Sequence, residues 1–304
     1  MKNYIKRYIS NFSDKNIIIS GANGYIGKEL VSQLTLNKIK YTGIDKRENE
    51  KHHHAILNLQ DSTKSIELIS NVDCDYFIHA GTHSAMAYSD NFLECFYQDL
   101  SSLRNIFIGL KKSTNCRLIY FSSSYVYSGI SREVKVDESF PLTPTHNFGL
   151  AKSFFEQIIL RNHPNCIIFR LSSVFGGVNS IHPNAITNMI HEAKENNFLT
   201  LWGQGERQMQ YIFIEDVVKY ILLSFYIDSG TYNLGAHDYK NIHETSKQIA
   251  QYFGIKVEKL SHKKEGVTLP FMQNNKIISA TSSDFSLDIT ANLNKYLLEL
   301  EDSF

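Results

Sequence analysis

The sequence predicts an α/β fold: a doubly wound parallel sheet with helices on both faces, followed by a smaller C-terminal lobe. First, short apolar runs alternate with helical stretches between positions 16 and 170, and such runs are typical of strands buried on both faces. Second, 304 residues with 42% hydrophobic and 20% charged side chains suit one compact core or two closely joined lobes. Third, the pattern loosens beyond Arg170, which favours a small lobe built from insertions.

The expected elements follow one another along the chain. The strands are NIIISG (Asn16–Gly21), KYTGID (Lys40–Asp45), DYFIHA (Asp75–Ala80), RLIYFSS (Arg117–Ser123) and CIIFRLSS (Cys166–Ser173). The helices are GKELVSQLTL (Gly27–Leu36), Phe92–Lys112, Asn147–Asn162, Asn184–Asn196, Ile214–Tyr226 and Ile242–Phe253. We therefore expect one domain over residues 1–170, in which residues 1–15 are an N-terminal extension. Residues 171–304 are expected to form mainly a substrate-binding lobe intertwined with that domain.

Charge and cysteine content narrow the class of protein. Lys plus Arg equals Asp plus Glu at 31 each, so no global field favours nucleic acid or an anionic membrane. The four cysteines are scattered without a C-x-x-C pair, which favours reduced thiols over a disulfide scaffold or a zinc site. No apolar run approaches the ~20 residues of a membrane span, and the opening MKNYIKRYISNFSDKN lacks a signal-peptide pattern. These features predict a cytoplasmic protein that binds neither nucleic acid nor membranes.

Three further patterns receive structural interpretations. Apolar residues recur at helical spacing from Tyr4 to Phe12, which predicts a short helix packed on the domain, with a membrane-surface helix as the alternative. The run HHH at His52–His54 is expected in a solvated loop, because adjacent residues rarely converge on one ion and no carboxylate or thiol cluster accompanies it. We therefore predict no metal site. His79 and His83 flank the turn after a strand, and His79 is expected to pack in the core.

The segment SGANGYIG carries the strongest local signal for a ligand. Its glycines, Gly21, Gly24 and Gly27, follow a strand and open a helix, which is the setting that such a motif requires. Glycines let the backbone turn sharply and approach a pyrophosphate, which then lies on the amides and the positive end of the helix. The segment predicts a Rossmann-type domain with a dinucleotide bound at this turn.

The second strand ends in a carboxylate, Asp45, 24 residues after the first glycine. A carboxylate here accepts hydrogen bonds from the adenosine ribose and repels the extra phosphate of NADP, so it favours NAD. Lys46 and Arg47 follow immediately and can pair with that phosphate, which leaves NADP as the alternative. Asn58 and Asp61 are placed to reach the adenine edge.

These motifs and later ones together resemble a known family. The GxxGxxG spacing, FIHAG (Phe77–Gly81), the serine run before VY (Val126–Tyr127), FGLAKSFFE and FRLSSVFG (Phe169–Gly176) follow the order found in extended short-chain dehydrogenases/reductases. The resemblance covers about residues 16–252 and is closest to the nucleotide-sugar branch of the NAD-dependent epimerase/dehydratase family. It implies NAD as cofactor. It also implies a homodimer in which the helices at Phe92–Lys112 and Asn147–Asn162 form a four-helix interface. From the sequence alone, apolar positions such as Leu103, Phe154 and Ile158 can face this interface or the sheet.

The resemblance assigns roles residue by residue. Ser123 matches the catalytic Ser/Thr that bonds the reacting sugar oxygen, and Lys152 matches the lysine that binds the nicotinamide ribose and keeps a tyrosine partly ionised. Phe148 stands at the position of that tyrosine, four residues before Lys152 on the same helix face. The residues expected to bind the cofactor are Gly21, Asn23, Gly24, Tyr25, Ile26, Gly27, Asp45, Asn58, Leu59, His79, Ala80, Gly81 and Lys152.

The substrate side departs from the family pattern. Ser124 and Tyr125 stand where family dehydratases carry Asp and Glu, so elimination of water is disfavoured and SSSYVYSG looks more like a reductase of 4-keto sugars. Met209 and Gln210 replace an Arg-Asp pair whose arginine usually contacts the diphosphate of the substrate, and Arg207 can substitute for it. The residues expected to bind the substrate are Ser123, Ser124, Tyr125, Ser173 and Arg207.

Phe148 leaves three explanations open, because it cannot donate a proton and loss of a general acid/base typically costs about 10² to 10⁴ in rate. The first explanation is that Phe148 is an introduced substitution that traps a bound substrate. The second is that Phe148 is natural and that Tyr125, Tyr127 or a water relays the proton. The third is that the chain has kept the fold and the dinucleotide while losing redox catalysis.

The expected function is C4 epimerisation or 4-keto reduction of a nucleotide-linked sugar. This is an isomerase or oxidoreductase reaction in which hydride is exchanged with nicotinamide, and the resemblance implies it. The alternative is a non-catalytic dinucleotide-binding protein with a structural or regulatory role.

Overall fold

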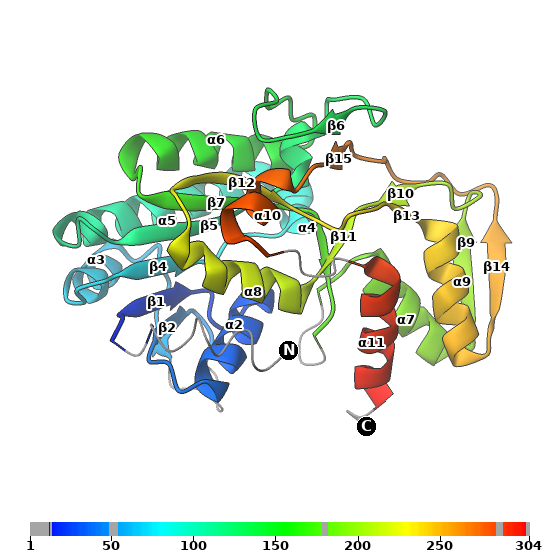
Figure 1. Ribbon diagram of the computed structural model, residues 1–304, viewed down its shortest axis with the longest axis horizontal. Helices are drawn as coiled ribbons and strands as arrows, with labels where there is room; N and C mark the ends of the chain where they lie inside the picture. The colour runs from blue at the N-terminus through cyan, green and yellow to red at the C-terminus, as the bar shows by residue number, and fades with distance from the viewer. Residues whose placement is uncertain (1–11, 13, 49–53, 178–181, 284–287, 302–304) are drawn as a thin grey trace. The chain divides into compact units, whose positions relative to one another are not determined.

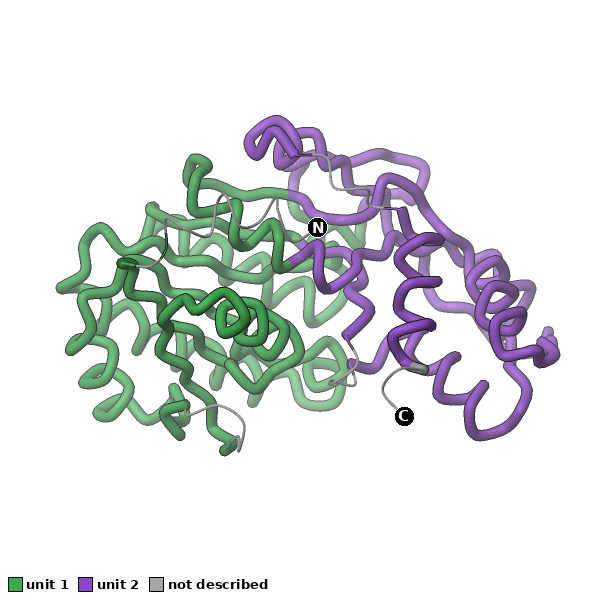
Figure 2. The backbone as a smooth tube through the Cα atoms, turned by 60° about the horizontal axis from the view of Figure 1, so that its bottom comes forward, with its two compact units in different colours: residues 1–129, 142–170, 218–232 green, residues 130–141, 171–217, 233–304 purple. Residues whose placement is uncertain are grey.

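Figure 1 shows a computed structural model of the chain, which describes residues 12, 14–48, 54–177, 182–283 and 288–301. The chain forms two compact units, coloured green and purple in Figure 2. Unit 1 contains residues 1–129, 142–170 and 218–232, and unit 2 contains residues 130–141, 171–217 and 233–304. Neither unit is one continuous segment of the chain.

The central feature of the fold is a seven-stranded sheet with the strand order β12-β7-β5-β4-β1-β2-β3. Its strands are β1 (Ile17–Ser20), β2 (Thr42–Asp45), β3 (Ala55–Ile56), β4 (Tyr76–His79), β5 (Arg117–Ser123), β7 (Cys166–Leu171) and β12 (Gly230–Leu234). β1 pairs in parallel with both β2 and β4, and β4 pairs in parallel with β5. The direction of winding reverses beside β1, and open α/β sheets bind their ligands at such a switch point. The predicted doubly wound α/β fold is confirmed.

Helices cover both faces of this sheet within unit 1 (Figure 1). They are α2 (Tyr25–Leu36), α3 (Ser62–Ser70), α4 (Ala85–Asp90), α5 (Phe92–Gly109) and α6 (Asn147–Asn162), with 3-10 turns η2 (Leu110–Lys112) and η3 (Ser124–Tyr127). α5 contacts α3 and α6 on one face, and α2 lies on the other. None of the described helices has both the length and the apolar character that crossing a membrane requires.

Side chains at the helix starts explain where most of these helices begin. Asp61, Ser84, Asn91 and His146 accept hydrogen bonds from amides in the first turns of α3, α4, α5 and α6, respectively. α2 begins differently, because its N-cap residue Gly24 has no side chain and no acidic residue stands in its first turn. The positive end of the α2 dipole is therefore left uncompensated by the chain, which favours an anion there.

One hydrophobic core of unit 1 lies between the sheet and the helices α3, α5 and α6. Phe77, Leu118 and Ile168 from three strands meet Ile106 and Phe155 from two helices, and all are buried. Full burial of side chains of this size stabilises the fold by roughly 1.5–3 kcal/mol each. All four cysteines are buried and free, in agreement with the expected reduced thiols.

The segments expected at the N-terminus and at the histidine run are only partly described. Tyr4 to Asn11 lie outside the described residues, but Phe12 is buried, with its ring centroid 4.7 Å from that of Phe225. His52 and His53 also lie outside the described residues. His54 is half-buried and its Nδ1 lies 3.1 Å from Oδ1 of Asn23, so the expected solvated loop is wrong for this residue.

Unit 2 is assembled from two-stranded sheets and helices. Its strands are β6 (Lys135–Val136), β8 (Ser173–Phe175), β9 (Phe198–Trp202), β10 (Gln208–Met209), β11 (Tyr211–Phe213), β13 (Lys240–Asn241), β14 (Lys256–Leu260) and β15 (Phe271–Met272). Its helices are α7 (Ala185–Asn196), α9 (Ile242–Phe253), α10 (Asn275–Thr281) and α11 (Ile289–Glu301). The chain returns to unit 1 within α8 (Ile214–Leu223), which η4 (Ser224–Tyr226) follows. The predicted smaller C-terminal part is thus present as a set of small sheets.

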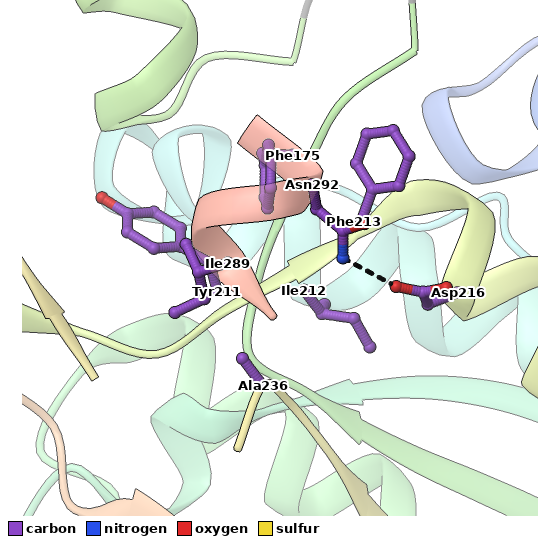
Figure 3. A pocket seen from close by; sticks show the side chains of 8 residues that line it. All are labelled: Phe175, Tyr211, Ile212, Phe213, Asp216, Ala236, Ile289 and Asn292. Carbon is purple, nitrogen blue, oxygen red and sulfur yellow. Dashed lines mark hydrogen bonds between the residues drawn. The ribbon is translucent and has the colours of Figure 1, made fainter. Parts of the chain in front are cut away.

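A hollow between α11 and β11 in unit 2 is closed by side chains. Figure 3 shows the residues around it: Phe175, Tyr211, Ile212, Phe213, Asp216, Ala236, Ile289 and Asn292. Asn292 Nδ2 donates a hydrogen bond to Asp216 Oδ2 over 3.1 Å, the dashed line in Figure 3. The hollow has no room for a water molecule, so it is part of the packing of unit 2 and not a ligand site.

Candidate active site

The glycine motif forms a main-chain cradle at the end of β1. Gly21 has φ +70°, a backbone conformation that favours glycine. A Cβ on Gly21 would lie 2.5 Å from the main chain of Gly81, so the turn after β1 packs directly on the turn after β4. A Cβ on Gly27 would lie 2.0 Å from the carbonyl oxygen of Gly21, which brings the start of α2 against the same turn. Together with the uncapped start of α2, this cradle fits a pyrophosphate.

Asp45 is buried at the end of β2 and borders the cradle. Its Oδ2 accepts a hydrogen bond from the amide of Asn23 over 2.9 Å, and its Oδ1 accepts one from the amide of Arg47 over 3.0 Å. The guanidinium of Arg47 also approaches Oδ1, at 3.4 Å. A carboxylate offers about four acceptor positions, so Asp45 retains capacity for the hydroxyls of a ribose. Lys46 is exposed.

Two other predicted cofactor residues have enclosed side chains. Leu59 is buried, and its carbonyl oxygen accepts a hydrogen bond from Asn105 Nδ2 over 2.8 Å. His79 is 1% exposed, and its Nδ1 lies 2.7 Å from Ser20 Oγ. Burial lowers the pKa of His79 to about 4. His79 is therefore the packed core histidine that was expected, and only its main chain is open to a cofactor role. Asn58, by contrast, is exposed.

Lys152 is almost fully buried on α6, and each proton of its ammonium group has an acceptor. Nζ lies 3.0 Å from Thr82 Oγ1, 3.2 Å from Tyr120 OH and 2.8 Å from the carbonyl oxygen of Phe121. An ammonium group has three donors, so these contacts use them all. Burial lowers the pKa of Lys152 to about 8, although the charge of Asp99 acts to raise it.

Phe148 takes the place next to this ammonium without offering a polar atom. Its ring is half-buried, 5.7 Å from the ring of Tyr88 and 6.1 Å from that of Tyr125 by centroids. Lys152 Nζ lies 5.4 Å from the centroid of the Phe148 ring. The ring therefore forms a cation–π contact, and it can neither take nor give a proton.

Ser123 ends β5 and caps the turn η3. Its Oγ accepts a hydrogen bond from the amide of Tyr125 over 3.3 Å, and its hydroxyl proton is donated to none of the described residues. That proton is available to a substrate oxygen. Ser124 is buried, while Tyr125 is half-buried with its ring 4.7 Å from that of His146. Tyr127 is fully buried and its hydroxyl accepts a hydrogen bond from Arg170, so the hypothesis of a relay through Tyr127 is wrong.

Unit 2 contains the two remaining residues predicted for the substrate. Ser173 starts β8 and is held by a hydrogen bond from its amide to the carbonyl oxygen of Gln210 over 3.2 Å. The side chain of Gln210 is itself tied to the main chain of Ala236 and Met272, which makes it a structural residue. Arg207 donates from Nε to a main-chain oxygen, that of Val267, over 3.0 Å.

A buried carboxylate next to Lys152 was not predicted from the sequence. Asp99 on α5 is 4% exposed and accepts hydrogen bonds from His83 Nδ1 over 2.7 Å and from Tyr88 OH over 2.8 Å. Burial acts to raise the pKa of Asp99, but the hydrogen bond from His83 and the charge of Lys152 outweigh it and lower this pKa. A signal was present, because residue 99 shares the buried face of α5 with positions 95, 102, 103 and 106. A carboxylate at such a position marks a buried charge.

Within the described ranges, no group of three His, Cys, Asp or Glu side chains is placed to hold a metal ion. The candidate site of unit 1 thus consists of the glycine cradle, Asp45, Ser123 and Lys152, with Phe148 and the pair His83–Asp99 beside them.

Comparison with known proteins places the chain in a family. A sequence profile described as the NAD dependent epimerase/dehydratase family matches residues 17–235, more than half of the chain. The chain belongs to this family. One curated relative of this member is a putative UDP-glucose 4-epimerase of Methanocaldococcus jannaschii, 25% identical over 264 residues that cover 81% of this chain and 85% of the relative. The family resemblance inferred from the motifs is confirmed.

This family member has two further similarities, one in sequence to a different kind of protein and one in fold to a solved structure. Methionine adenosyltransferase 2 subunit beta of Bos taurus is 24% identical over 192 residues, covering 62% of this chain and 55% of that subunit. The chain thus spans about half the length of that relative. The UDP-glucose 4-epimerase of Thermotoga maritima, solved with UDP-glucose, superposes with a TM-score of 0.84 at 15% identity, covering 95% of this chain and 99% of the epimerase. At this identity, the likeness concerns the fold alone.

Proposed function

We propose that this chain binds NAD and catalyses redox chemistry at C4 of a nucleotide-linked sugar, by epimerisation or by 4-keto reduction. The observation that carries the proposal is the gathering of Ser123, Lys152 and the glycine cradle in unit 1, where the hydroxyl proton of Ser123 is donated to none of the residues described. Membership of a family described as NAD dependent supports the cofactor. The relative named as a putative UDP-glucose 4-epimerase supports the class of substrate.

Each group of the site has a task in this proposal. NAD, when bound, supplies the acceptor and donor of hydride. Ser123 donates its hydroxyl proton in a hydrogen bond to the reacting sugar oxygen and so holds it in place. Lys152 would hold the nicotinamide ribose in place of one of its present acceptors. Ser124, Tyr125, Ser173 and Arg207 are the proposed contacts of the nucleotide sugar.

We propose NAD and not NADP because of the surroundings of Asp45. Its carboxylate is buried and would repel a phosphate on the adenosine ribose. Arg47, the natural partner for such a phosphate, already approaches Asp45 Oδ1 at 3.4 Å and donates to the carbonyl oxygen of Asn23 over 3.1 Å. The guanidinium of Arg47 is therefore already partly paired within the protein and is less available to a phosphate.

A homodimer is part of the proposal. α5 exposes Leu93 and Tyr97, and α6 exposes Leu150 and Phe154, with exposed fractions of 76%, 68%, 48% and 40%. Apolar side chains gathered on neighbouring helices mark a surface that favours burial against a partner. Leu103, for which the sequence left the interface and the sheet open, is 1% exposed and belongs to the core.

The second candidate function is a dinucleotide-binding protein without turnover. Phe148 has no proton to exchange, and the ammonium of Lys152 has all its donors engaged inside the protein. The similarity to a protein named as a subunit of methionine adenosyltransferase supports a role in an assembly.

One experiment separates the two functions. The purified protein is incubated with NAD and UDP-glucose, then with UDP-galactose and the 4-keto derivatives. NADH absorbance and NMR spectra of the sugar follow the reaction. The enzymatic proposal expects transient NADH and a changed sugar. The second candidate expects saturable binding of NAD, measured by calorimetry, with no NADH and no change in any sugar.

A further inference from the structure

His83 lies in the loop after β4, at the carboxyl end of the sheet and next to Thr82, which accepts a hydrogen bond from Lys152. Its main-chain amide donates to both carboxylate oxygens of Asp99, over 3.2 and 3.4 Å. Its ring Nδ1 lies 2.7 Å from Asp99 Oδ1. Backbone and side chain of His83 are thus fixed by the same carboxylate.

Asp99 is itself held in place. Tyr88 OH donates to its Oδ2 over 2.8 Å, and the carboxylate is 4% exposed. The carboxylate of Asp99 accepts a hydrogen bond from Nδ1 of His83. The neutral imidazole of His83 therefore carries its proton on Nδ1 and has its lone pair on Nε2. Asp99 therefore sets which nitrogen of His83 can take a proton.

The other edge of the ring is open. The side chain of His83 is 25% exposed, and Nε2 has no hydrogen-bond partner among the residues that the structure describes. The ring of Tyr88 neighbours both His83 and Phe148, with its centroid 6.4 Å from that of His83 and 5.7 Å from that of Phe148. His83 thus offers a proton acceptor that shares a neighbouring ring with Phe148, which offers none.

We propose that His83 is the proton-transfer residue of this site, positioned by Asp99, in place of a hydroxyl at residue 148. This inference rests on the proposed redox function at C4. In the oxidation, the O–H bond of the sugar breaks and its proton passes to Nε2 of His83, while the C–H bond breaks and its electron pair leaves with hydride to the cofactor. A carbonyl and an imidazolium result, and the carboxylate of Asp99 stabilises the imidazolium. In the reduction, Nε2 returns the proton to the oxygen as hydride returns to the carbon.

The charged and titratable groups around His83 come from four elements: Tyr88 on α4, Asp99 on α5, Lys152 on α6 and Tyr120 on β5. Among the described residues, Asp99 is the hydrogen-bond partner of the imidazole, and the ring of Tyr88 meets it edge-on. Lys152 acts on it through Asp99, and the two tyrosines remain neutral because burial raises the pKa of each well above its usual value.

The test uses His83→Gln, which keeps a side chain of similar length and removes the titrating ring. Hydride exchange is measured with UDP-glucose and NAD as probes, in the natural chain and in the Phe148→Tyr variant. We expect His83→Gln to lower kcat by at least ~10²-fold in the natural chain, and to leave KM and the Kd of NAD within about threefold. In the Phe148→Tyr background, where the added hydroxyl supplies a proton, the same change should cost less than about tenfold. His191→Gln, at a well-exposed histidine of α7, is the matched control.

A second readout does not depend on activity. ¹⁵N NMR of the histidine rings is expected to show neutral His83 protonated on Nδ1, and Asp99→Asn is expected to shift that population toward the other tautomer. Asp99→Asn should lower kcat with KM unchanged, as a positioning residue would.

Several outcomes overturn the proposal. One such outcome is an active natural chain whose kcat is unchanged by His83→Gln. Another is an equal fold-loss of kcat on His83→Gln in the natural chain and in the Phe148→Tyr variant. In both cases His83 transfers no proton, while the redox function stands. If only the Phe148→Tyr variant is active, the fold supports the chemistry but His83 does not serve it. If both are inert while NAD binds, the redox function fails and His83 has no such role. A proton on Nε2 in the neutral ring also overturns it.

Discussion

The ammonium nitrogen of Lys152 lies 5.4 Å above the centre of the Phe148 ring and points its protons at three oxygen atoms of the protein. The position that faces the ammonium is thus an aromatic ring of the size of tyrosine without its hydroxyl. This arrangement makes residue 148 the most informative position to change.

Phe148→Tyr is expected to raise turnover of a nucleotide sugar at least ~10²-fold. The rings differ in one hydroxyl, which costs little repacking if it points at the polar side. The nearby ammonium favours the phenolate and lowers the pKa of the new hydroxyl toward neutrality. NADH absorbance and NMR of the sugar measure the change. Phe107→Tyr on α5, half-buried and in contact with His163, is the control and should change nothing. A variant slower than the natural chain would show that Phe148 belongs to a different mechanism.

Asp45→Ala is expected to weaken NAD binding far more than NADP binding, because only the ribose without a phosphate gains from the carboxylate. The substitution also removes the acceptor of the Asn23 and Arg47 amides, at a cost of roughly 1–3 kcal/mol in stability. Calorimetric titration with both cofactors is the measurement, and Asp228→Ala at an exposed site is the control. An equal loss for both cofactors would contradict the assignment of Asp45 to the ribose.

His79 is expected to make the protein less stable as the pH falls from about 6.5 to about 4. Its pKa is 6.5 in the unfolded chain and about 4 in the folded one, so in this window the unfolded state binds the additional proton. Stability is therefore lost on acidification, by up to about 3 kcal/mol from this residue. Urea unfolding at several pH values measures the free energy of unfolding as a function of pH. This free energy should change less with pH for His79→Asn than for the natural chain. Parallel pH dependences for the variant and the natural chain would refute the prediction.

Leu150→Asp is expected to convert a homodimer into monomers, because it places a charge in the apolar surface of α5 and α6. The measurement is the molar mass by light scattering at micromolar concentration. Leu298→Asp on α11 is the matched control, since Leu298 is 57% exposed but lies in unit 2. A monomeric natural chain, or a dimer that survives Leu150→Asp, would rule out this interface.

Several elements could be predicted closely from the sequence. β5 (Arg117–Ser123), α6 (Asn147–Asn162) and α9 (Ile242–Phe253) have the predicted bounds, because strong periodicity coincides with clear end signals such as the cap Asn241 of α9. The run Cys166–Ser173 was predicted as one strand. It divides at residue 172 into β7, within the large sheet, and β8, which pairs with β11.

That division could not be predicted, because an apolar run reports burial and does not say which partner each residue meets. The same reason explains which residues of the candidate site could be predicted and which could not. Ser123 and Lys152 lie in local motifs and could be placed. The pair His83–Asp99 joins a loop to the middle of a helix, 16 positions apart, and only the tertiary fold brings them together. α3 was missed for another reason, since Ser62–Ser70 is short and rich in polar residues.

The discontinuous course of unit 1 has a consequence for synthesis on the ribosome. β12 is the edge strand of the large sheet and neighbours β7, but residues 171–217 of unit 2 are translated between them. The nascent sheet therefore exposes β7 as an unpaired edge until residues 230–234 have left the exit tunnel. Open edges of this kind pair with other chains. Slow translation or truncation within 171–229 should thus favour aggregation of a sheet that is otherwise complete.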